Sequence, residues 1–304
     1  MSNHNIKLSI IIPSFNYADY IDVAIKSVID QTMSAHEIIV VDDGSTDHTS
    51  TVVEALQGKY SNSNICYFYQ DNQGVSTARN YGYKRSSGDY LLFLDADDKL
   101  LPGTLKVVYE EISNRSEIDM IFGGYQAVSY SGELRLRTPV KLVESNLENV
   151  ITLLNGKMVG LRPSSSVLKR CVLDKIKFPL KVHVDEDTMF FSHVMYHYKC
   201  VSIPDILVEM PRHTDSLREN YQRIIETGVH GVEELFASLP SSNELLKLKK
   251  HVLVKRYLKV GRISCINKDY KIASQNYLNA AKLEPRAVLN LKHFPRLMKS
   301  LVLR

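Results

Sequence analysis

The chain has 304 residues, of which 44% are hydrophobic and 24% are charged. These proportions are ordinary for a globular protein, so they exclude a disordered chain and predict a sizeable core, in one large domain or in a main domain with a smaller one. The net charge of +4 is too small to indicate nucleic-acid binding, and no nucleic-acid partner is expected.

Four short apolar runs in the first third of the chain are rich in β-branched and aromatic residues, which is typical of buried strands. These predicted strands are residues 8–13, 37–41, 65–70 and 90–94. Each is followed by a segment whose apolar residues have helical spacing. These predicted helices are residues 20–31, 48–57, 74–86 and 101–114. Four successive strand–helix pairs predict an α/β fold with a Rossmann-like parallel sheet and helices on both faces.

From about residue 119 the pattern becomes mixed, and after about residue 219 it is helical throughout. The mixed region is predicted to contain strands at 120–124, 126–130, 201–204 and 206–210, and helices at 147–154 and 187–198. In the helical region, residues 252–266 and 270–283 are similar to one tetratricopeptide-type hairpin. A single hairpin of this kind cannot bury its own apolar face, so we expect it to pack on another part of the protein.

Polar side chains follow three of the four predicted strands, at the points where the strands end. Ser14 to Tyr17 follow the first strand, Asp42 and Asp43 follow the second, and residues 95–98 follow the fourth. Ligands of such sheets bind at the carboxyl ends of the strands. The sequence therefore predicts a binding site at this edge of the sheet.

The acidic cluster after the fourth strand permits two interpretations. Asp95 and Asp97 flank Ala96, and two carboxylates so placed can share a hard cation such as Mn²⁺ or Mg²⁺, which would also hold a diphosphate. Alternatively, Asp97 or Asp98 caps the helix predicted from residue 101. The cluster alone does not decide between a metal site and a helix cap.

Three further groups are open to two interpretations each. Asp42 either accepts hydrogen bonds from a nucleotide or belongs to a plain glycine turn. Arg79 either pairs with a phosphate or is a solvated helix residue. The acids at 185–187 either complement a helix dipole or include a general base that takes a proton from an attacking hydroxyl.

Five motifs, in order, resemble those of the family 2 glycosyltransferases, which have the GT-A fold. The motifs are residues 10–17, 39–47, 72–80, 88–98 and 185–188. The resemblance covers about residues 7–216 and is strongest over the first 110. It implies a GT-A domain at residues 1–218, with a nucleotide-binding half at 1–115 and an acceptor-side half at 116–218. A C-terminal α-helical extension at residues 219–304 would follow.

The resemblance implies a role for each matching residue. The donor-binding positions would be Pro13, Ser14, Phe15, Tyr17, Asp42, Arg79, Asp95 and Ala96. Among them, Asp95 matches the acid that contacts the ribose and Arg79 an Arg near the base and phosphates. Asp97 matches the ligand of Mn²⁺ or Mg²⁺. Asp187 matches the catalytic base, with Glu186 beside it in the substrate site.

A later segment, residues 210–216, is similar to a family segment whose His or Arg often faces the diphosphate. Arg212 would then contact the substrate and His213 the metal. The segment departs from the family pattern, because Met210 and Pro211 stand where an aromatic residue is usual and His213 directly follows Arg212.

The resemblance implies inverting transfer of a sugar, expected to be a hexose, from a nucleotide-diphosphate donor, for which the family favours a UDP-sugar. The acceptor would be a hydroxyl of a glycan, as in the synthesis of lipid-linked cell-surface polysaccharide. Asp187 would deprotonate that hydroxyl, and the reaction needs no covalent enzyme intermediate.

The C-terminal residues 286–304 contain five Lys or Arg and no acid. Mixed basic and apolar residues either bind an anionic membrane surface or form a helix that docks on the core. No apolar run reaches the roughly 18 residues of a membrane span, and the four cysteines lack zinc spacing. A cytoplasmic protein is expected, at most peripheral to the inner face of the cell membrane.

Three alternatives compete with the transferase interpretation. A haloacid-dehalogenase-type phosphatase also carries Asp-x-Asp after a strand, but on its first strand and usually followed by Thr, where Lys99 stands here. A dinucleotide oxidoreductase requires a glycine-rich turn that is missing after the first strand. The third alternative is an inactive GT-A-like domain that binds a glycan or a partner.

Overall fold

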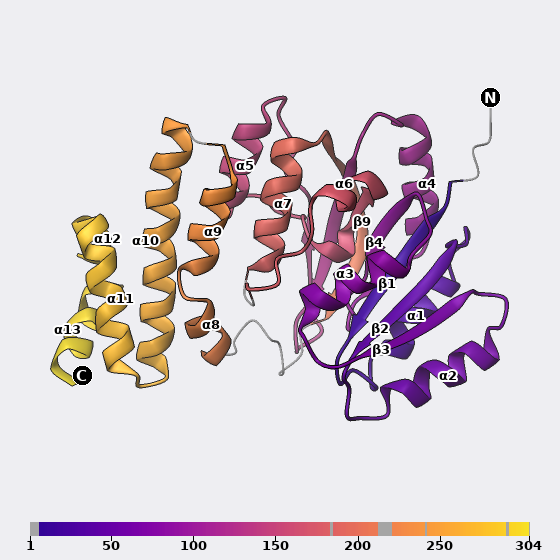
Figure 1. Cartoon of the computed structure of the whole chain (residues 1–304), viewed down its shortest axis with the longest axis horizontal. Coiled ribbons are helices and arrows are strands. Elements are labelled where there is room, and N and C mark those ends of the chain that lie inside the picture. Colours follow the sequence, from indigo (N-terminus) through magenta and orange to yellow (C-terminus); the bar gives the residue numbers. More distant parts are fainter. Residues whose placement is uncertain (1–5, 183–184, 212–220, 241, 290–291, 304) are drawn as a thin grey trace. The chain divides into compact units, whose positions relative to one another are not determined.

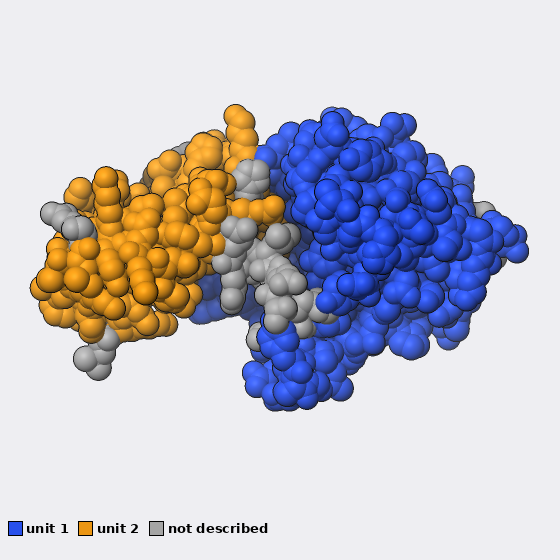
Figure 2. Space-filling model, turned by 90° about the horizontal axis from the view of Figure 1, so that it is seen from below, with its two compact units in different colours: residues 1–180, 190–214 blue, residues 181–189, 215–304 orange. Residues whose placement is uncertain are grey.

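The structure is a computed structural model that describes residues 6–182, 185–211, 221–240, 242–289 and 292–303. Its internal contacts divide the chain into two compact units (Figure 2). The sheet unit comprises residues 1–180 and 190–214, and the helical unit comprises residues 181–189 and 215–304. The predicted domain boundary between residues 218 and 219 places residues 181–189 in the first domain, whereas the contacts place them in the helical unit. The boundary stays a prediction.

The sheet unit is built on one mixed sheet (Figure 1). Its strands are β1 (Leu8–Ser14), β2 (Glu37–Asp43), β3 (Ile65–Gln70), β4 (Tyr90–Phe93), β5 (Lys99–Leu100), β6 (Met120–Val128), β7 (Leu134–Arg137), β8 (Ser166–Lys169) and β9 (Cys200–Pro211). They lie in the order β3-β2-β1-β4-β8-β6-β9-β5, and β7 pairs with β6. The pairs among β1 to β4 are parallel, which confirms the predicted α/β fold.

Helices of this unit flank the sheet. They are α1 (Ile21–Ile29), α2 (Thr49–Lys59), α3 (Val75–Arg85), α4 (Thr104–Asn114), α5 (Asn146–Leu154), α6 (Arg170–Lys175) and α7 (Glu186–His197), the first turn of which belongs to the helical unit. Side chains of β1 alternate between the faces: Ile10 and Ile12 share a core with α1, α2 and α4, whereas Ile11 meets α3 at Gly82. Each fully buried Ile contributes roughly 1.5–3 kcal/mol.

The mixed half differs from prediction where glycine or proline seemed to interrupt a strand. β6 and β9 are each one continuous strand, and their pairing is irregular between Phe122 and Tyr125. At Gly123 a Cβ would lie 2.5 Å from Leu207 Cγ, so this residue marks close backbone approach. Pro204 lies opposite the same irregularity, where a ladder donor is dispensable.

A short strand, β5, lies directly before the residue at which a helix was predicted to begin. It pairs with β9, and the helix begins later, at Thr104, with Gly103 as its N-cap. Pro102 lies in the turn that precedes this helix. The interpretation of Asp97 or Asp98 as the cap of this helix is therefore wrong.

The helical unit contains α8 (Tyr221–Thr227), α9 (His230–Ser238), α10 (Asn243–Ile266), α11 (Tyr270–Leu283), α12 (Pro285–Val288) and α13 (Phe294–Leu303) (Figure 1). As predicted, α10 and α11 form a hairpin with a turn at residues 267–269. Asp269 caps α11 by accepting a hydrogen bond from Ile272 N at 3.1 Å. The C-terminal extension is thus helical.

The basic tail packs against this hairpin. Val288 and Leu297 join Tyr277 and Ala280 in a buried cluster, so the tail docks on the unit's core. Pro295 lies in the first turn of α13, which is a separate helix from α12. None of the described helices combines the length and the apolar character needed to cross a bilayer.

Candidate functional site

Strand pairing gathers the predicted strand ends at one sheet edge. Ser14, the last residue of β1, is in register with Asp42 of β2. On the other side of β1, Leu94 N donates to Ile11 O at 2.9 Å, which extends the pairing of β4 to the residue before Asp95. Ser14, Asp42 and Asp95 therefore lie at the ends of three adjacent parallel strands.

Asn16 joins the loops that follow β1 and β2. Its backbone N donates to Ser45 Oγ at 2.8 Å, and its Oδ1 accepts from Thr46 N at 2.8 Å. Asn16 has a φ of +57°, which asparagine tolerates better than most residues. Its neighbour Phe15 is 37% exposed beside this junction. The sequence predicts a polar loop here. The hydrogen bonds between the two loops depend on the tertiary fold, and no local pattern in the sequence indicates them.

Asp42 is buried and already engaged. Its Oδ1 accepts from Ser45 N at 2.8 Å and its Oδ2 from Tyr67 Oη at 2.6 Å. Burial and then the hydrogen bond to Asp42 raise the pKa of Tyr67. The glycine-turn interpretation of Asp42 is correct for its Ser45 bond. A carboxylate can accept further hydrogen bonds, and contact with a nucleotide stays a prediction. Sequence reasoning missed Tyr67.

Asp43 fixes the start of α3. Its carboxylate accepts from Gly74 N at 2.7 Å, from Gln73 N at 2.9 Å and from Gln70 Nε2 at 2.6 Å. A negative charge at a helix N-terminus also complements the helix dipole. The end of β2 thereby holds the helix that carries Arg79.

Arg79 is only 4% exposed, so the interpretation as a solvated helix residue is wrong. Its Nη2 lies 2.7 Å from Asp95 Oδ1, and its guanidinium lies 5.1 Å from the centroid of the Phe178 ring. Asn80 holds the backbone of Phe178 through two hydrogen bonds. Arg79 thus orients Asp95, while its contact with a phosphate stays a prediction.

Ser164 ties the acidic loop together. Its hydroxyl donates to Asp98 Oδ2 at 2.6 Å and accepts from Asp95 N at 3.1 Å. Ser164 is fully buried in a 3-10 turn, η1 (Pro163–Ser165), far along the chain from the loop. This contact explains why Asp98 is buried without capping α4. Sequence reasoning missed Ser164, because nothing near the acidic cluster signals it.

Asp97 is half-buried between Ala96, which packs in the core, and Asp98. Burial and then the negative charge of Asp97 raise the pKa of Tyr17. Among the described residues, no three His, Cys, Asp or Glu side chains gather as a metal-binding group. Hard carboxylate oxygens nevertheless suit Mn²⁺ or Mg²⁺, which commonly take only one or two protein carboxylates besides phosphate oxygens.

The remaining predicted site residues belong to the helical unit or fall outside the described residues. Glu186 and Asp187 begin α7 and belong to the helical unit, whereas the donor-binding positions belong to the sheet unit. Asp187 Oδ1 accepts from Thr188 N at 2.7 Å. Arg212 and His213 lie outside the described residues, so their predicted roles stay predictions.

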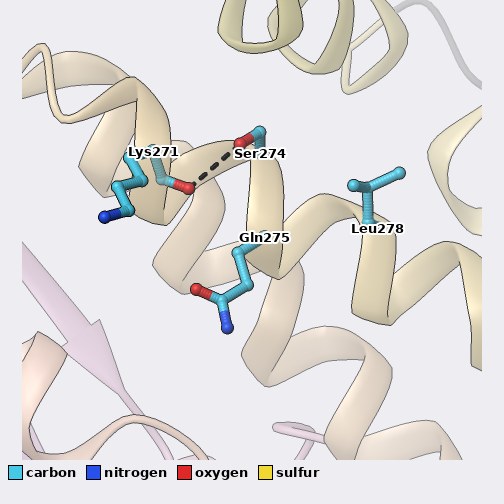
Figure 3. Close-up of a pocket in the computed structure, with 4 residues that line it drawn as sticks. All are labelled: Lys271, Ser274, Gln275 and Leu278. Atoms are coloured by element: carbon cyan, nitrogen blue, oxygen red, sulfur yellow. Dashed lines mark hydrogen bonds between the residues drawn. The ribbon is translucent and has the colours of Figure 1, made fainter. Parts of the chain in front are cut away.

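A surface hollow on α11 contains none of the predicted residues. It is lined by Lys271, Ser274, Gln275 and Leu278 (Figure 3). These side chains come from one face of one helix, and Ser274 Oγ already donates to the carbonyl of Lys271 at 3.0 Å. The hollow does not bear on the acidic loop.

Solved structures share this architecture. S. aureus TarS residues 1–349, in complex with UDP-GlcNAc, matches with a TM-score of 0.59 at 21% identity, over 93% of this chain and 90% of that one. The mannosyltransferase PcManGT from Pyrobaculum calidifontis, in complex with GDP-Man and Mn²⁺, matches with a TM-score of 0.58 at 17% identity, over 98% and 84%. Identities this low establish the fold alone, which is the GT-A fold.

Sequence similarity gives the family. Residues 9–174 match the family described as Glycosyl transferase family 2, and because this is more than half of the chain, the protein belongs to that family. Because the chain belongs to this family, the alternatives of a phosphatase and of an oxidoreductase are excluded. One relative, the minor teichoic acid biosynthesis protein GgaB of Bacillus subtilis, is 31% identical over 204 residues, 64% of this chain and 22% of that protein. The chain spans 26%, 54% and 37% of the length of three further relatives.

Proposed function

We propose that the protein is an inverting glycosyltransferase that takes a sugar from a nucleotide-diphosphate donor, preferably a UDP-sugar. The observation that carries this proposal is the acidic loop, which Arg79 and Ser164 hold at the same carboxyl edge of the sheet as Asp42. A GT-A neighbour binds UDP-GlcNAc and another binds GDP-Man with Mn²⁺, which supports a nucleotide-sugar donor and a divalent metal.

The donor would lie along the strand ends. The nucleoside would contact the loop that includes Ser14, Phe15 and Tyr17, and Asp42 would meet the base. Asp95, oriented by Arg79, would accept hydrogen bonds from the ribose. Asp97 would hold Mn²⁺ or Mg²⁺, with the diphosphate completing the coordination. A bound divalent cation supplies charge stabilisation for the departing diphosphate.

The transfer would be a single displacement. The carboxylate of Asp187 takes the proton of an acceptor hydroxyl as that oxygen forms a bond to the anomeric carbon. The bond from the same carbon to the diphosphate oxygen breaks, and the nucleoside diphosphate leaves with the electron pair. Attack opposite the leaving group inverts the anomeric centre, and the sugar transferred would be a hexose.

The acceptor would be a glycan of a cell-surface polysaccharide. The similarity to a protein named for teichoic acid biosynthesis supports this class of acceptor. A lipid-linked glycan would place the enzyme at the cytoplasmic face of the membrane. The basic tail, with exposed apolar residues on α13, supports peripheral attachment there.

A thermal-shift panel of nucleotide-sugars with and without Mn²⁺ tests the donor site. We expect one donor to stabilise the protein only with metal, by roughly 2.7 kcal/mol at a hundredfold excess over Kd. Asp97→Ala should abolish this shift and sugar transfer, whereas Asp205→Ala, at an exposed position of the sheet unit, should leave both unchanged. Metal-dependent binding and normal turnover by Asp97→Ala would refute the proposed metal site.

Asp187→Asn separates catalysis from binding. It should keep metal-dependent donor binding but lower kcat by roughly 10²–10⁴-fold, the usual contribution of a general base. Loss of donor binding or of folding would instead make Asp187 a structural residue. A wild-type protein that binds the donor and a glycan yet transfers nothing would favour the inactive-domain alternative.

A further inference from the structure

Asp185, directly before α7, has a backbone conformation that its surroundings must hold. Its φ is +66°, in the left-handed region that few residues other than glycine adopt. Its carbonyl accepts a hydrogen bond from Met189 N at 3.2 Å, the first of α7. The backbone of Asp185 therefore sets where the first turn of this helix begins, and such strained residues persist only where neighbouring contacts fix them.

The contacts that fix Asp185 come from α10. Its carboxylate accepts a hydrogen bond from Arg256 Nη1 and lies 3.2 Å from Lys259 Nζ. Arg256 is 6% exposed, and its Nε donates to Gly228 O, between α8 and α9. A buried guanidinium with hydrogen bonds on two sides has little freedom to move. All of these residues belong to the helical unit.

We propose that Asp185, Arg256 and Lys259 form a positioning clamp for Asp187. This inference rests on the proposed function, in which Asp187 is the general base. Asp187 lies two residues after Asp185, in the helical turn that the Asp185 carbonyl starts. The clamp residues act through Asp187 and are not catalytic residues themselves. The C-terminal helices thereby become part of the catalytic apparatus.

Steady-state kinetics and donor binding on the full chain test the clamp. Asp185→Asn and Arg256→Lys should lower kcat roughly 10–100-fold, the scale of a small misplacement of a catalytic group. The Kd for donor with Mn²⁺ should change less than about twofold, because no donor contact is altered. Lys259→Met, which leaves the Arg256 pair in place, should cause a smaller loss. Lys250→Met, which removes the charge of an exposed lysine on the same helix, should leave kcat unchanged.

Two further measurements exclude a purely structural role. Assays run well below the measured Tm of every variant keep all of them folded, and Lys259→Met remains informative if the stronger variants do not fold. In an Asp187→Asn background, Asp185→Asn should cause no additional loss of kcat, since both changes disable one base. An additive loss would overturn the clamp.

The outcomes distinguish the clamp from the function on which it rests. Normal kcat in Asp185→Asn, Arg256→Lys and Lys259→Met, with Asp187→Asn inactive, would overturn the clamp alone. Normal kcat in Asp187→Asn would remove the proposed base and the clamp with it. Wild-type transfer with a selective loss of kcat in the clamp variants is the result we expect.

Discussion

Ser164 contacts the acidic loop from a position 69 residues beyond Asp95 in the chain. Removing its hydroxyl by Ser164→Ala leaves the buried Asp98 carboxylate without that donor, which costs roughly 1–3 kcal/mol. We expect lower stability in urea unfolding and weaker Mn²⁺-dependent donor binding by calorimetry. Ser113→Ala, which removes an exposed hydroxyl that donates to the Tyr109 carbonyl on α4, is the control. Equal effects of both changes would contradict a role for Ser164 in the loop.

The predicted donor residues and those missed differ in where their signal lies. Asp42, Asp95 and Asp97 follow apolar strands directly, so the sequence alone places them at the sheet edge. Tyr67 and Ser164 act on these acids from other segments, and the local sequence of neither indicates a contact. Such partners require the tertiary fold, because a hydrogen bond between distant residues leaves no pattern in one sequence.

At the level of elements, Gly82 decides how closely α3 approaches the sheet. A Cβ at this position would lie 2.4 Å from Ile11 Cγ2, so Gly82→Ala should destabilise the protein by about 1–3 kcal/mol through overpacking. Gly58, on α2, has nothing within 4 Å of an added Cβ. Gly58→Ala should therefore stabilise by about 0.5–1 kcal/mol. Urea unfolding of both variants checks the pair, and a Gly82→Ala variant as stable as the Gly58→Ala variant would contradict the close packing of α3.

The sequence predicts the elements of the first half well and those of the second half less well. Apolar runs and helical periodicity locate β1 to β4 and the following helices because each element has its own local pattern. Glycines and Pro204 made β6 and β9 look divided, whereas the structure uses these residues where the two strands pair irregularly. The extent of these two strands and the existence of the short β5 depend on pairing with distant segments, which a local sequence pattern does not indicate.

At the level of the whole molecule, the docked tail leaves an apolar row exposed on α13. Phe294, Met298 and Val302 recur every four residues, and are 43%, 45% and 77% exposed. We expect the full chain to sediment with phosphatidylglycerol vesicles but not with phosphatidylcholine vesicles, and less so as salt screens the basic residues. Replacing Phe294 and Val302 with Ser should abolish this binding.

The control for that experiment keeps the tail in place. Cutting the chain after Pro285 would uncover the buried Tyr277, so surface substitutions are the cleaner test. Leu246→Ser changes an exposed apolar residue of α10 in the same unit and should bind vesicles as the wild type does. Equal binding of the Phe294 and Val302 variant to anionic vesicles would exclude α13 as the membrane-contacting surface.

Residues 181–189 belong to the helical unit although they precede the last strand of the sheet unit in the chain. The proposed base is thus encoded between two segments of the sheet unit, yet its packing depends on helices encoded afterwards. A recombination that replaced only the C-terminal helices would leave the nucleotide contacts intact while giving Asp187 a new structural support.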